Sequence, residues 1–347
     1  MKKLIQTILF LLLSFSRLAA GQKELIKEYS YPKNDQDYFF KPISSLAVFD
    51  NLVYAVENLS NKVVALRLDF PQIKYLFDIG KPGQGPGDLM YPISISIWGD
   101  DIAIKEASAF SFFSRDGRFR SKFKVFSNNK SFFFQDDKIY WLNPSIKQDY
   151  LVEVYLKNGK RISTIGSKSI IPQVVTNDPS RVDSIYEGII VFYDKSIFYL
   201  NSRFGNFCRY SLDGNILVEG DMSDVFGNRG RAIKEFNTAV YINNERRKAG
   251  DVGYPKPLLF EASTIHNNDL FFLGSRYDPK GDGRTYLDLK RYSLDSMVGK
   301  DDYVIEKKGF CRIDSFIILD HKGTLFMLLS ITDFGEGHFL EIYELRQ

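Results

Sequence analysis

One pattern of turns and strands repeats along this chain and limits the folds that it can adopt. Each copy has a polar turn followed by an apolar strand, and copies occur at 49–58, 98–107, 134–143, 192–201, 265–274 and 319–328. A second alternating strand follows each copy, at 63–69, 109–117, 151–159, 207–214, 287–295 and 339–347. Polar tight turns between alternating strands are typical of antiparallel hairpins. The repeat therefore predicts an all-β protein built from similar units.

The register of the repeat is preserved from copy to copy. An apolar residue stands three positions before a polar turn residue in five copies, as Leu66 does before Asp69. A further strand follows that turn in the same five copies, at 72–79, 118–125, 160–166, 215–220 and 302–308. The sixth copy has no such strand because the chain ends at Gln347. An orphan strand at 23–31 can supply the missing partner beside 339–347.

Six four-stranded antiparallel units, the last completed by the first strand of the chain, describe a six-bladed β-propeller. Closing the ring in this way leaves no long sheet edge exposed. An aromatic content of 15% agrees with an all-β fold. The alternative is a pair of β-sandwich domains, and the shared register of six hairpin pairs favours the propeller over it.

The interval between the fourth and fifth units is much longer than the others, and residues 223–262 fill it. Ile233, Phe236 and Val240 fall at helical spacing within this insertion, with arginines and lysines around them. The pattern predicts a short helix laid over one face of the ring. It can serve as a solvated connector or as a lid or partner surface.

The first 21 residues have the three parts of a secretory signal peptide: Lys2 and Lys3, an apolar run at 4–15, and small residues at 19–21. The run is shorter than the roughly 20 residues of a membrane-spanning helix, although an uncleaved anchor is an alternative. We therefore expect residues 22–347 to form a secreted or periplasmic propeller with no transmembrane segment after cleavage.

Removing the signal segment also changes the charge of the protein. The segment holds Lys2, Lys3 and Arg17 and no acid, so Lys plus Arg falls from 46 to 43, which equals the 43 Asp plus Glu. The mature chain is formally neutral. The sequence therefore gives no reason to expect nucleic-acid binding.

The stretch GKPGQGPGDLMYP, from Gly80 to Pro92, is dense in glycine and proline. A phosphate-binding loop would carry Gly-Lys-Ser/Thr or G-x-G-x-x-G and open a helix. Here a strand led by proline follows instead, and Pro86 removes an amide that a phosphate cradle would use. The pattern favours a fixed connection between two strands.

This stretch resembles the blade junction of NHL-type six-bladed propellers, in which G-x-x-G-x-G-P-G-[DE]-[FL]-x-x-P links the last strand of one blade to the first strand of the next. The repeat plan of the whole mature chain is similar to that of secreted NHL-like propellers, mostly of unassigned function, that are common in Bacteroidetes bacteria. The sharp motif occurs once, and other junctions such as 165–173 have drifted. The resemblance implies the fold and the export of the chain, and it implies no particular ligand.

The histidines and cysteines do not predict a metal site. His266 and His321 lie in turns between first and second strands, whereas His338 follows a second strand, so they should face opposite sides of the ring. This separation disfavours a three-histidine zinc site of the kind found in a related class of propeller lyases. Cys208 and Cys311 fall in blades that are not neighbours, so we expect buried free thiols.

A glycine-rich loop at 278–283 carries Asp278 and Asp282. In a calcium loop of the EF-hand type, an oxygen ligand would stand two residues after the first aspartate, and Lys280 occupies that position. We therefore expect neither a metal nor a cofactor.

The candidate binding residues lie near the ends of the second strands, on one face of the predicted ring. Arg203 and Arg276 share a register there with Asn58 and Ser145, and Glu106 and Asp333 lie close by. Arginine forks beside aromatic rings suit an anionic or glycan-like ligand. The candidate ligand-binding set is Arg203, Arg276, Glu57, Asn143, Asn201, Trp141, Tyr277 and Tyr91. For each of them the alternative is an ordinary solvated loop end.

These features predict a binding or interaction module, expected as a monomer, whose small-molecule, glycan or protein partner sits at the mouth of the central channel. The alternative is a metal-dependent enzyme of the lyase or lactonase type. Such an enzyme needs acids or histidines that converge on a metal, and the sequence offers no such cluster.

Overall fold

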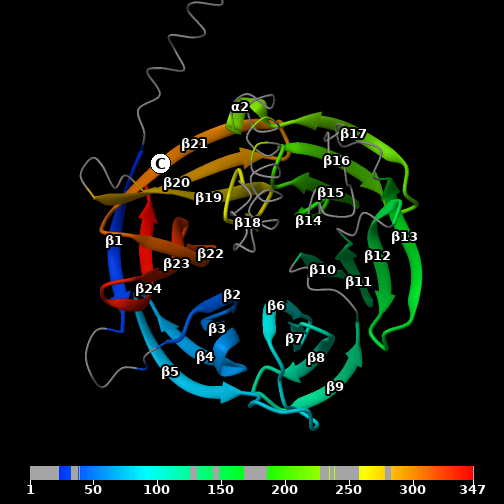
Figure 1. The fold of residues 1–347 in the computed structure, drawn as a ribbon, viewed down its shortest axis with the longest axis horizontal. Helices are drawn as coiled ribbons and strands as arrows, with labels where there is room; N and C mark the ends of the chain where they lie inside the picture. Colours follow the sequence, from blue (N-terminus) through cyan, green and yellow to red (C-terminus); the bar gives the residue numbers. More distant parts are fainter. Residues whose placement is uncertain are drawn as a thin grey trace, which may run out of the picture.

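The computed structural model describes residues 23–32, 38, 40–125, 131–143, 148–167, 186–226, 234, 238, 258–277 and 283–346. In these ranges the chain forms six four-stranded antiparallel blades around a central axis (Figure 1). The prediction of a six-bladed β-propeller is confirmed. The expected signal peptide, the 278–282 loop and most of the 223–262 insertion lie outside the described residues.

In blades one to five the strands run in chain order from the axis outwards, and in blade six the N-terminal strand is the outermost. Blade one comprises β2 (Ile43–Phe49), β3 (Leu52–Glu57), β4 (Lys62–Asp69) and β5 (Gln72–Ile79). Blade two comprises β6 (Pro92–Trp98), β7 (Asp101–Glu106), β8 (Ala109–Ser114) and β9 (Phe119–Lys124). Blade three comprises β10 (Phe132–Gln135), β11 (Lys138–Leu142), β12 (Tyr150–Leu156) and β13 (Arg161–Ser167). Blade four comprises β14 (Gly188–Tyr193), β15 (Ser196–Asn201), β16 (Asn206–Ser211) and β17 (Ile216–Asp221). Blade five comprises β18 (Ala262–His266), β19 (Asp269–Tyr277), β20 (Arg284–Ser293) and β21 (Val298–Lys308). Blade six comprises β22 (Cys311–His321), β23 (Thr324–Asp333), β24 (Gly337–Leu345) and β1 (Lys23–Tyr31). Two short helical turns, η1 (Asn58–Ser60) and α2 (Ser223–Phe226), follow strands β3 and β17.

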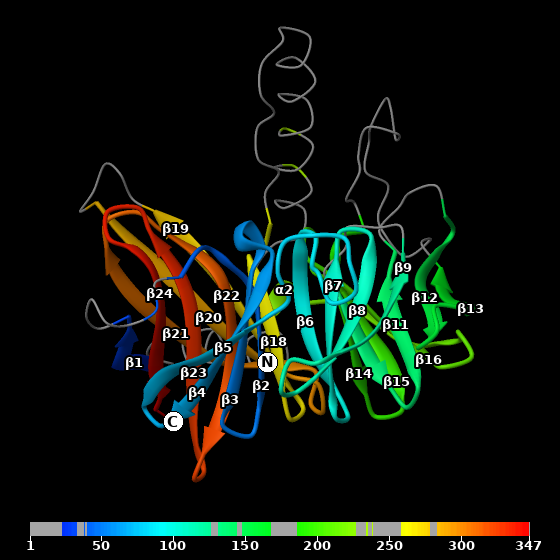
Figure 2. The same ribbon diagram turned by 90° about the horizontal axis from the view of Figure 1, so that it is seen from below.

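Antiparallel pairing sorts the loops onto two faces, which form the upper and lower edges in Figure 2. The loops between second and third strands and the junctions between blades lie on one face, which we call the junction face. The turns between first and second strands lie on the opposite face, which we call the hairpin face. His266 and His321 belong to the hairpin face, as the sequence predicts, whereas His338 begins β24 on the junction face.

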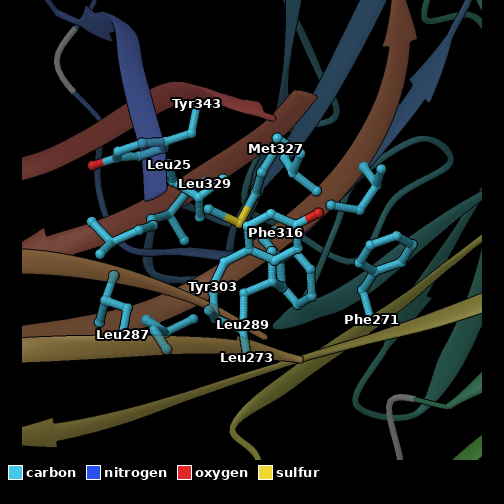
Figure 3. Packing of buried hydrophobic residues seen from close by; sticks show 14 of the residues in the cluster. Leu25, Phe271, Leu273, Leu287, Leu289, Tyr303, Phe316, Met327, Leu329 and Tyr343 are labelled. Carbon is cyan, nitrogen blue, oxygen red and sulfur yellow. The ribbon is translucent and has the colours of Figure 1, made fainter. Parts of the chain in front are cut away.

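The core lies between neighbouring blades rather than within any one of them. The middle strands are buried on both sides, as in β3 and β8, whereas the outermost strand β17 is largely exposed. Figure 3 shows the cluster between blades five and six, in which Leu25 of β1 packs near Tyr343 and Leu329. Each blade therefore depends on its neighbours for burial, and a break in the ring weakens more than one blade.

The N-terminal strand closes the ring, as the sequence predicts. Strand β1 pairs antiparallel with β24, from Leu25 opposite Leu345 to Tyr31 opposite Leu340. It also pairs in parallel with β21, where Lys23 lies opposite Tyr303, and this second pairing was not predicted. The two pairings join blades five and six into one eight-stranded sheet.

A buried carboxylate anchors this closure. Glu341 of β24 is 3% exposed and accepts hydrogen bonds from the ammonium groups of Lys27 and Lys307 and, at 2.7 Å, from the Tyr343 hydroxyl. Burial alone would raise the pKa of Glu341, but Lys307, Lys27 and Tyr343 outweigh it and hold that pKa below its usual value. One side chain thus connects β1, β21 and β24.

The stretch from Gly80 to Pro92 connects β5 to β6, as predicted for a blade junction. Leu89 turns inward and is completely buried, while its N–H donates to the carbonyl of Lys81 at 2.8 Å. The Asp88 carboxylate accepts from the N–H of Gly85 at 2.8 Å. A Cβ on Gly83 would lie 2.2 Å from that carboxylate, so the close turn requires glycine at this position.

Lys105 is a buried cation in the core between blades two and three. It is completely buried, donates to the carbonyl of Glu106, and its Nζ lies 5.4 Å from the centre of the Trp141 ring. Burial lowers the pKa of Lys105 to about 8, although the nearby Glu106 charge opposes this. The folded protein therefore holds this proton less tightly than the unfolded chain does.

Replacing Lys105 by methionine is expected to remove a pH-dependent part of the stability. Because the folded pKa lies below the ordinary 10.5, the free energy of unfolding rises with pH through the window between the two values. Between about pH 7 and about pH 9.5 this gain is about 2 kcal/mol. Urea titrations at both pH values give the change in free energy of unfolding for the parent and for Lys105→Met. The parent should gain more stability with pH than the variant, and an identical pH dependence in the two proteins would contradict the prediction.

Candidate functional site

The central channel contains a cavity of about 490 Å³. All six inner strands contribute to its wall, and residues Leu258 and Phe260, which precede β18, line it as well. Its volume falls within the range of roughly 300–1,000 Å³ that is typical of small-molecule sites. The channel is therefore the first place to look for a ligand.

Hydroxyl side chains dominate the polar part of this wall. The lining hydroxyls are those of Ser44, Ser45, Ser94, Ser96, Ser131, Ser202, Ser263, Thr264 and Ser315. Some of them connect neighbouring blades: Ser44 donates to the carbonyl of Ile93 at 2.9 Å, and the N–H of Ile190 donates to Ser131 at 2.8 Å. These bonds link inner strands that share no sheet.

Four other hydroxyls of the wall are available to a ligand. In the part of the chain that the structure describes, the side chains of Ser96, Ser263, Thr264 and Ser315 have no hydrogen-bond partner. Each hydroxyl can both donate and accept a hydrogen bond. They lie on β6, β18 and β22, so they face the channel from three different blades.

The charged side chains of the wall are acids, and each has a partner from its own chain. Glu187 pairs with Arg203, and Glu261 accepts from the N–H of Ser275 at 3.1 Å. Asp314 accepts from Arg312 at 2.9 Å. No Lys, Arg or His is among the described residues that line the cavity, so its interior presents hydroxyls and acids that are hydrogen-bonded within the chain.

Arg203, one of the predicted binding residues, lies at the edge of this cavity. Its side chain is buried beside the half-exposed Glu187, and burial lowers the pKa of the guanidinium while the Glu187 charge opposes the shift. Asn201 holds the turn that carries it, because its Oδ1 accepts from the N–H groups of Arg203 and Phe204, both at 2.9 Å. Asn201 itself is completely buried.

Asp314 leads to a second polar group at the mouth of the channel. The Thr332 hydroxyl donates to Asp314 Oδ2 at 2.6 Å and lies 2.7 Å from His338 Nδ1. Since the hydroxyl proton goes to the carboxylate, His338 donates from Nδ1 and its Nε2 is the acceptor. Burial lowers the pKa of His338, which favours the neutral imidazole.

Glu57, another predicted binding residue, holds the chain that enters its blade. It is completely buried and accepts from the Tyr38 hydroxyl and from the N–H of Lys41, both at 2.9 Å. Glu106, its counterpart in blade two, accepts from the N–H of Met90 at 2.7 Å. The acid at the end of the second strand thus fixes the incoming junction in both blades.

The two candidates of blade three lie near or inside its packed core. Trp141 is 2% exposed and packs between blades two and three. The Asn143 amide donates to Glu153 at 3.1 Å, and Tyr155 donates to the same carboxylate at 2.6 Å. Their described contacts are with the protein itself.

The remaining candidates are exposed on the junction face. Arg276 donates to Asp288 at 3.1 Å and lies 4.6 Å from the centre of the Tyr286 ring. Tyr277 and Tyr91 both expose their rings to solvent. The eight candidates come from four blades and one junction, so the structure spreads them around the ring and places Arg203 nearest the cavity.

The two cysteines are buried and free, as the sequence predicts. Burial is the main reason that the pKa of both Cys208 and Cys311 is raised to about 11. Each is therefore a thiol at neutral pH. Within the described ranges no three His, Cys, Asp or Glu side chains gather as a metal site would require. No helix among the described residues is long and apolar enough to cross a membrane.

Two solved structures from Bacteroides have the same overall fold. A putative exported protein from Bacteroides fragilis matches with a TM-score of 0.54 at 11% identity, covering 93% of this chain and 95% of its own. A member of the DUF4221 family from Bacteroides vulgatus matches with a TM-score of 0.51 at 10% identity, covering 94% and 99%. Identities this low show a shared propeller fold alone. No family model and no curated protein matches the sequence.

Proposed function

We propose that this protein is a secreted or periplasmic binding module of the NHL-like propeller type, which holds a small ligand at the junction-face mouth of its channel. The cavity of about 490 Å³, lined from all six blades, carries this proposal. The exported Bacteroides protein of the same fold agrees with this location. The module acts as a monomer, because the closed ring leaves no blade without a neighbour.

The wall of the cavity favours an uncharged ligand that bears hydroxyl groups. The unpartnered hydroxyls of Ser96, Ser263 and Ser315 can exchange hydrogen bonds with such a ligand. An anion would meet acids and no basic group inside the channel, so the arginines can act only at its rim. Of the anionic and glycan-like ligands that the arginines suggest, the glycan-like one fits this lining better.

Replacing Arg203 or Arg276 by alanine is expected to weaken ligand capture about 10-fold or more, because a hydrogen bond to a charged group contributes about 1.5–3 kcal/mol. Differential scanning fluorimetry with glucose, galactose, N-acetylglucosamine and glucuronic acid measures this loss of affinity. A bound ligand raises the melting temperature, and the size of the shift reports the affinity. Arg67→Ala is the matched control for Arg276→Ala, because Arg67 has a similarly exposed ion pair, with Asp69, at the hairpin face. Unchanged capture by both variants would remove these arginines from the site.

A further inference from the structure

Three aromatic side chains stand exposed and in contact on the junction face, where blades five and six meet. Tyr277, Phe310 and Phe334 are 42%, 49% and 60% exposed. The rings of Phe310 and Phe334 stack with centroids 5.0 Å apart at 29°, and Tyr277 meets Phe310 edge-on at 5.2 Å and 68°. We call these three residues the aromatic platform. Phe310 and Phe334 form a stacked pair, and Tyr277 stands edge-on at one side of it.

The backbone beneath Phe310 is held in place from both sides. The hydroxyl of Thr285, which is 1% exposed, donates to the carbonyl of Gly309 at 2.7 Å and accepts from the N–H of Cys311 at 3.1 Å. Thr285 also pairs with Tyr277 across β19 and β20. One buried hydroxyl therefore fixes the position of Phe310 relative to the strand that carries Tyr277.

The loop that carries Phe334 is fixed in a similar way. The Asp333 carboxylate accepts from the N–H groups of Gly335 and Glu336 at 2.8 and 3.2 Å. The N–H of Phe334 donates to the carbonyl of Phe310 at 3.4 Å. The platform is therefore a pre-ordered surface, and pre-ordering reduces the entropy that a ligand must overcome.

The size of the platform selects the kind of ligand. Three rings of roughly 200 Å² each, exposed by about half, present roughly 300 Å² of aromatic surface. A stable protein interface needs about 800 Å² per partner, so the platform is too small to hold a second copy of this chain. A patch of roughly 300 Å² is nevertheless within the range that is often functional on a monomer, and it matches one or two sugar rings.

The groups around the platform are suited to hydroxyls and not to phosphates. The Tyr277 hydroxyl has no hydrogen-bond partner among the described residues. Arg312, two positions after Phe310, is already bound to Asp314. The acids Asp333 and Glu336 stand on either side of Phe334 in the chain. A nucleic acid would need a positively charged groove along its backbone, and these two acids oppose such a groove.

We propose that the aromatic platform binds a pyranose ring of a neutral polysaccharide, with the C–H face of the sugar stacked on an exposed face of the Phe310–Phe334 pair. This inference rests on the proposed binding function and assigns it a ligand class and a second site. Aromatic faces carry partial negative charge, so they attract the polarised C–H groups on one side of a pyranose. The Tyr277 hydroxyl at the side of the pair can bond a ring hydroxyl.

Affinity electrophoresis of residues 22–347 in gels containing soluble β-glucan, starch, xylan or galactomannan tests this inference. We expect at least one of these polysaccharides to retard the parent protein, and the double variant F310A/F334A to lose at least about 10-fold in affinity. Leu59→Ala is the matched control, because Leu59 is an exposed apolar residue on the same face in blade one. Thermal melting of each variant shows that it is folded.

The outcomes separate the two sites. Retardation that is lost in F310A/F334A and kept in Leu59→Ala supports the platform. Equal retardation of the parent and F310A/F334A, or no retardation with any of the four polysaccharides, would overturn the platform proposal. In either case, sugar binding that depends on Arg203 would leave the channel proposal standing. A dimer in light scattering that F310A/F334A dissolves would show instead that the platform binds a second copy.

Discussion

Replacing Glu341 by alanine is expected to lower the free energy of unfolding by about 3–5 kcal/mol. The substitution removes a buried carboxylate and leaves Lys307, whose side chain is 14% exposed, without its partner. It also leaves the buried Tyr343 hydroxyl without an acceptor. Because Glu341 connects the first strand to both neighbouring strands, the loss falls on the point where the ring closes.

The matched control for this effect is Glu344→Ala. Glu344 lies on the same strand but is partly exposed, and it pairs only with Arg346 among the described residues, so its replacement should cost less than about 1 kcal/mol. Urea denaturation of both variants gives the two free energies. A loss for Glu341→Ala as small as that for Glu344→Ala would show that the closure does not depend on this carboxylate.

The same carboxylate predicts how the closure responds to acid. The pKa of Glu341 is lower in the folded protein than its ordinary value of 4.5. A depressed folded pKa contributes stability that is complete above the unfolded pKa and is lost as the pH falls through the folded one. The parent protein should therefore lose stability below about pH 4.5, whereas Glu341→Gln has no carboxylate to protonate at this position. The difference in free energy of unfolding between the two proteins should shrink as the pH is lowered.

The fold could be predicted from the sequence because a propeller repeats its information. The register that Leu66 shares with its counterparts marks the third strand of each blade. The sixth copy has no fourth strand before Gln347, and this points to β1 as the strand that closes the ring. The parallel pairing of β1 with β21 could not be predicted in the same way. The paired residues Tyr303 and Val304 lie inside the strand predicted at 302–308, but the repeat shows only which strands share a blade, and not which strands of neighbouring blades meet.

The candidate site was harder to predict because a polar side chain at a loop can serve the protein or a ligand. Glu57 and Asn201 occupy the predicted positions on the junction face, yet their hydrogen bonds hold the adjoining backbone. The sequence contains no signal of those bonds, since they form between segments brought together by the ring. The channel serines were also missed, because short hydroxyl residues in strands have no distinctive pattern.

The aromatic platform was missed for a related reason. Only Tyr277 falls within the register counted from the second strands, whereas Phe310 lies in a blade junction and Phe334 in a loop of blade six. A usable signal was present, since each of the two phenylalanines follows a turn residue, Gly309 or Asp333, at a strand end. Large aromatic residues at such turns stand outside the alternation that buries apolar side chains, and this indicates exposure.

Replacing Leu89 by alanine is expected to lower the free energy of unfolding by about 2–5 kcal/mol. Leu89 is completely buried between blades one and two, and it carries the blade junction into that core. The junction has little other apolar anchorage, because its remaining residues are mainly glycine, proline and polar side chains. Chemical denaturation measures the loss, and Met90→Ala is the matched control, because Met90 is adjacent but exposed.

A Cβ on Gly80 would lie 2.6 Å from the Leu89 side chain, so the glycine and the leucine fit each other. Gly80→Ala should therefore destabilise the wild-type protein more than it destabilises the Leu89→Ala variant, in which the shorter side chain leaves room for the methyl group. The positive φ of 74° at Gly80 remains unfavourable for alanine in both backgrounds. If the two losses are equal, backbone conformation alone requires the glycine; if they differ, the fit between Gly80 and Leu89 helps to set the path of the junction.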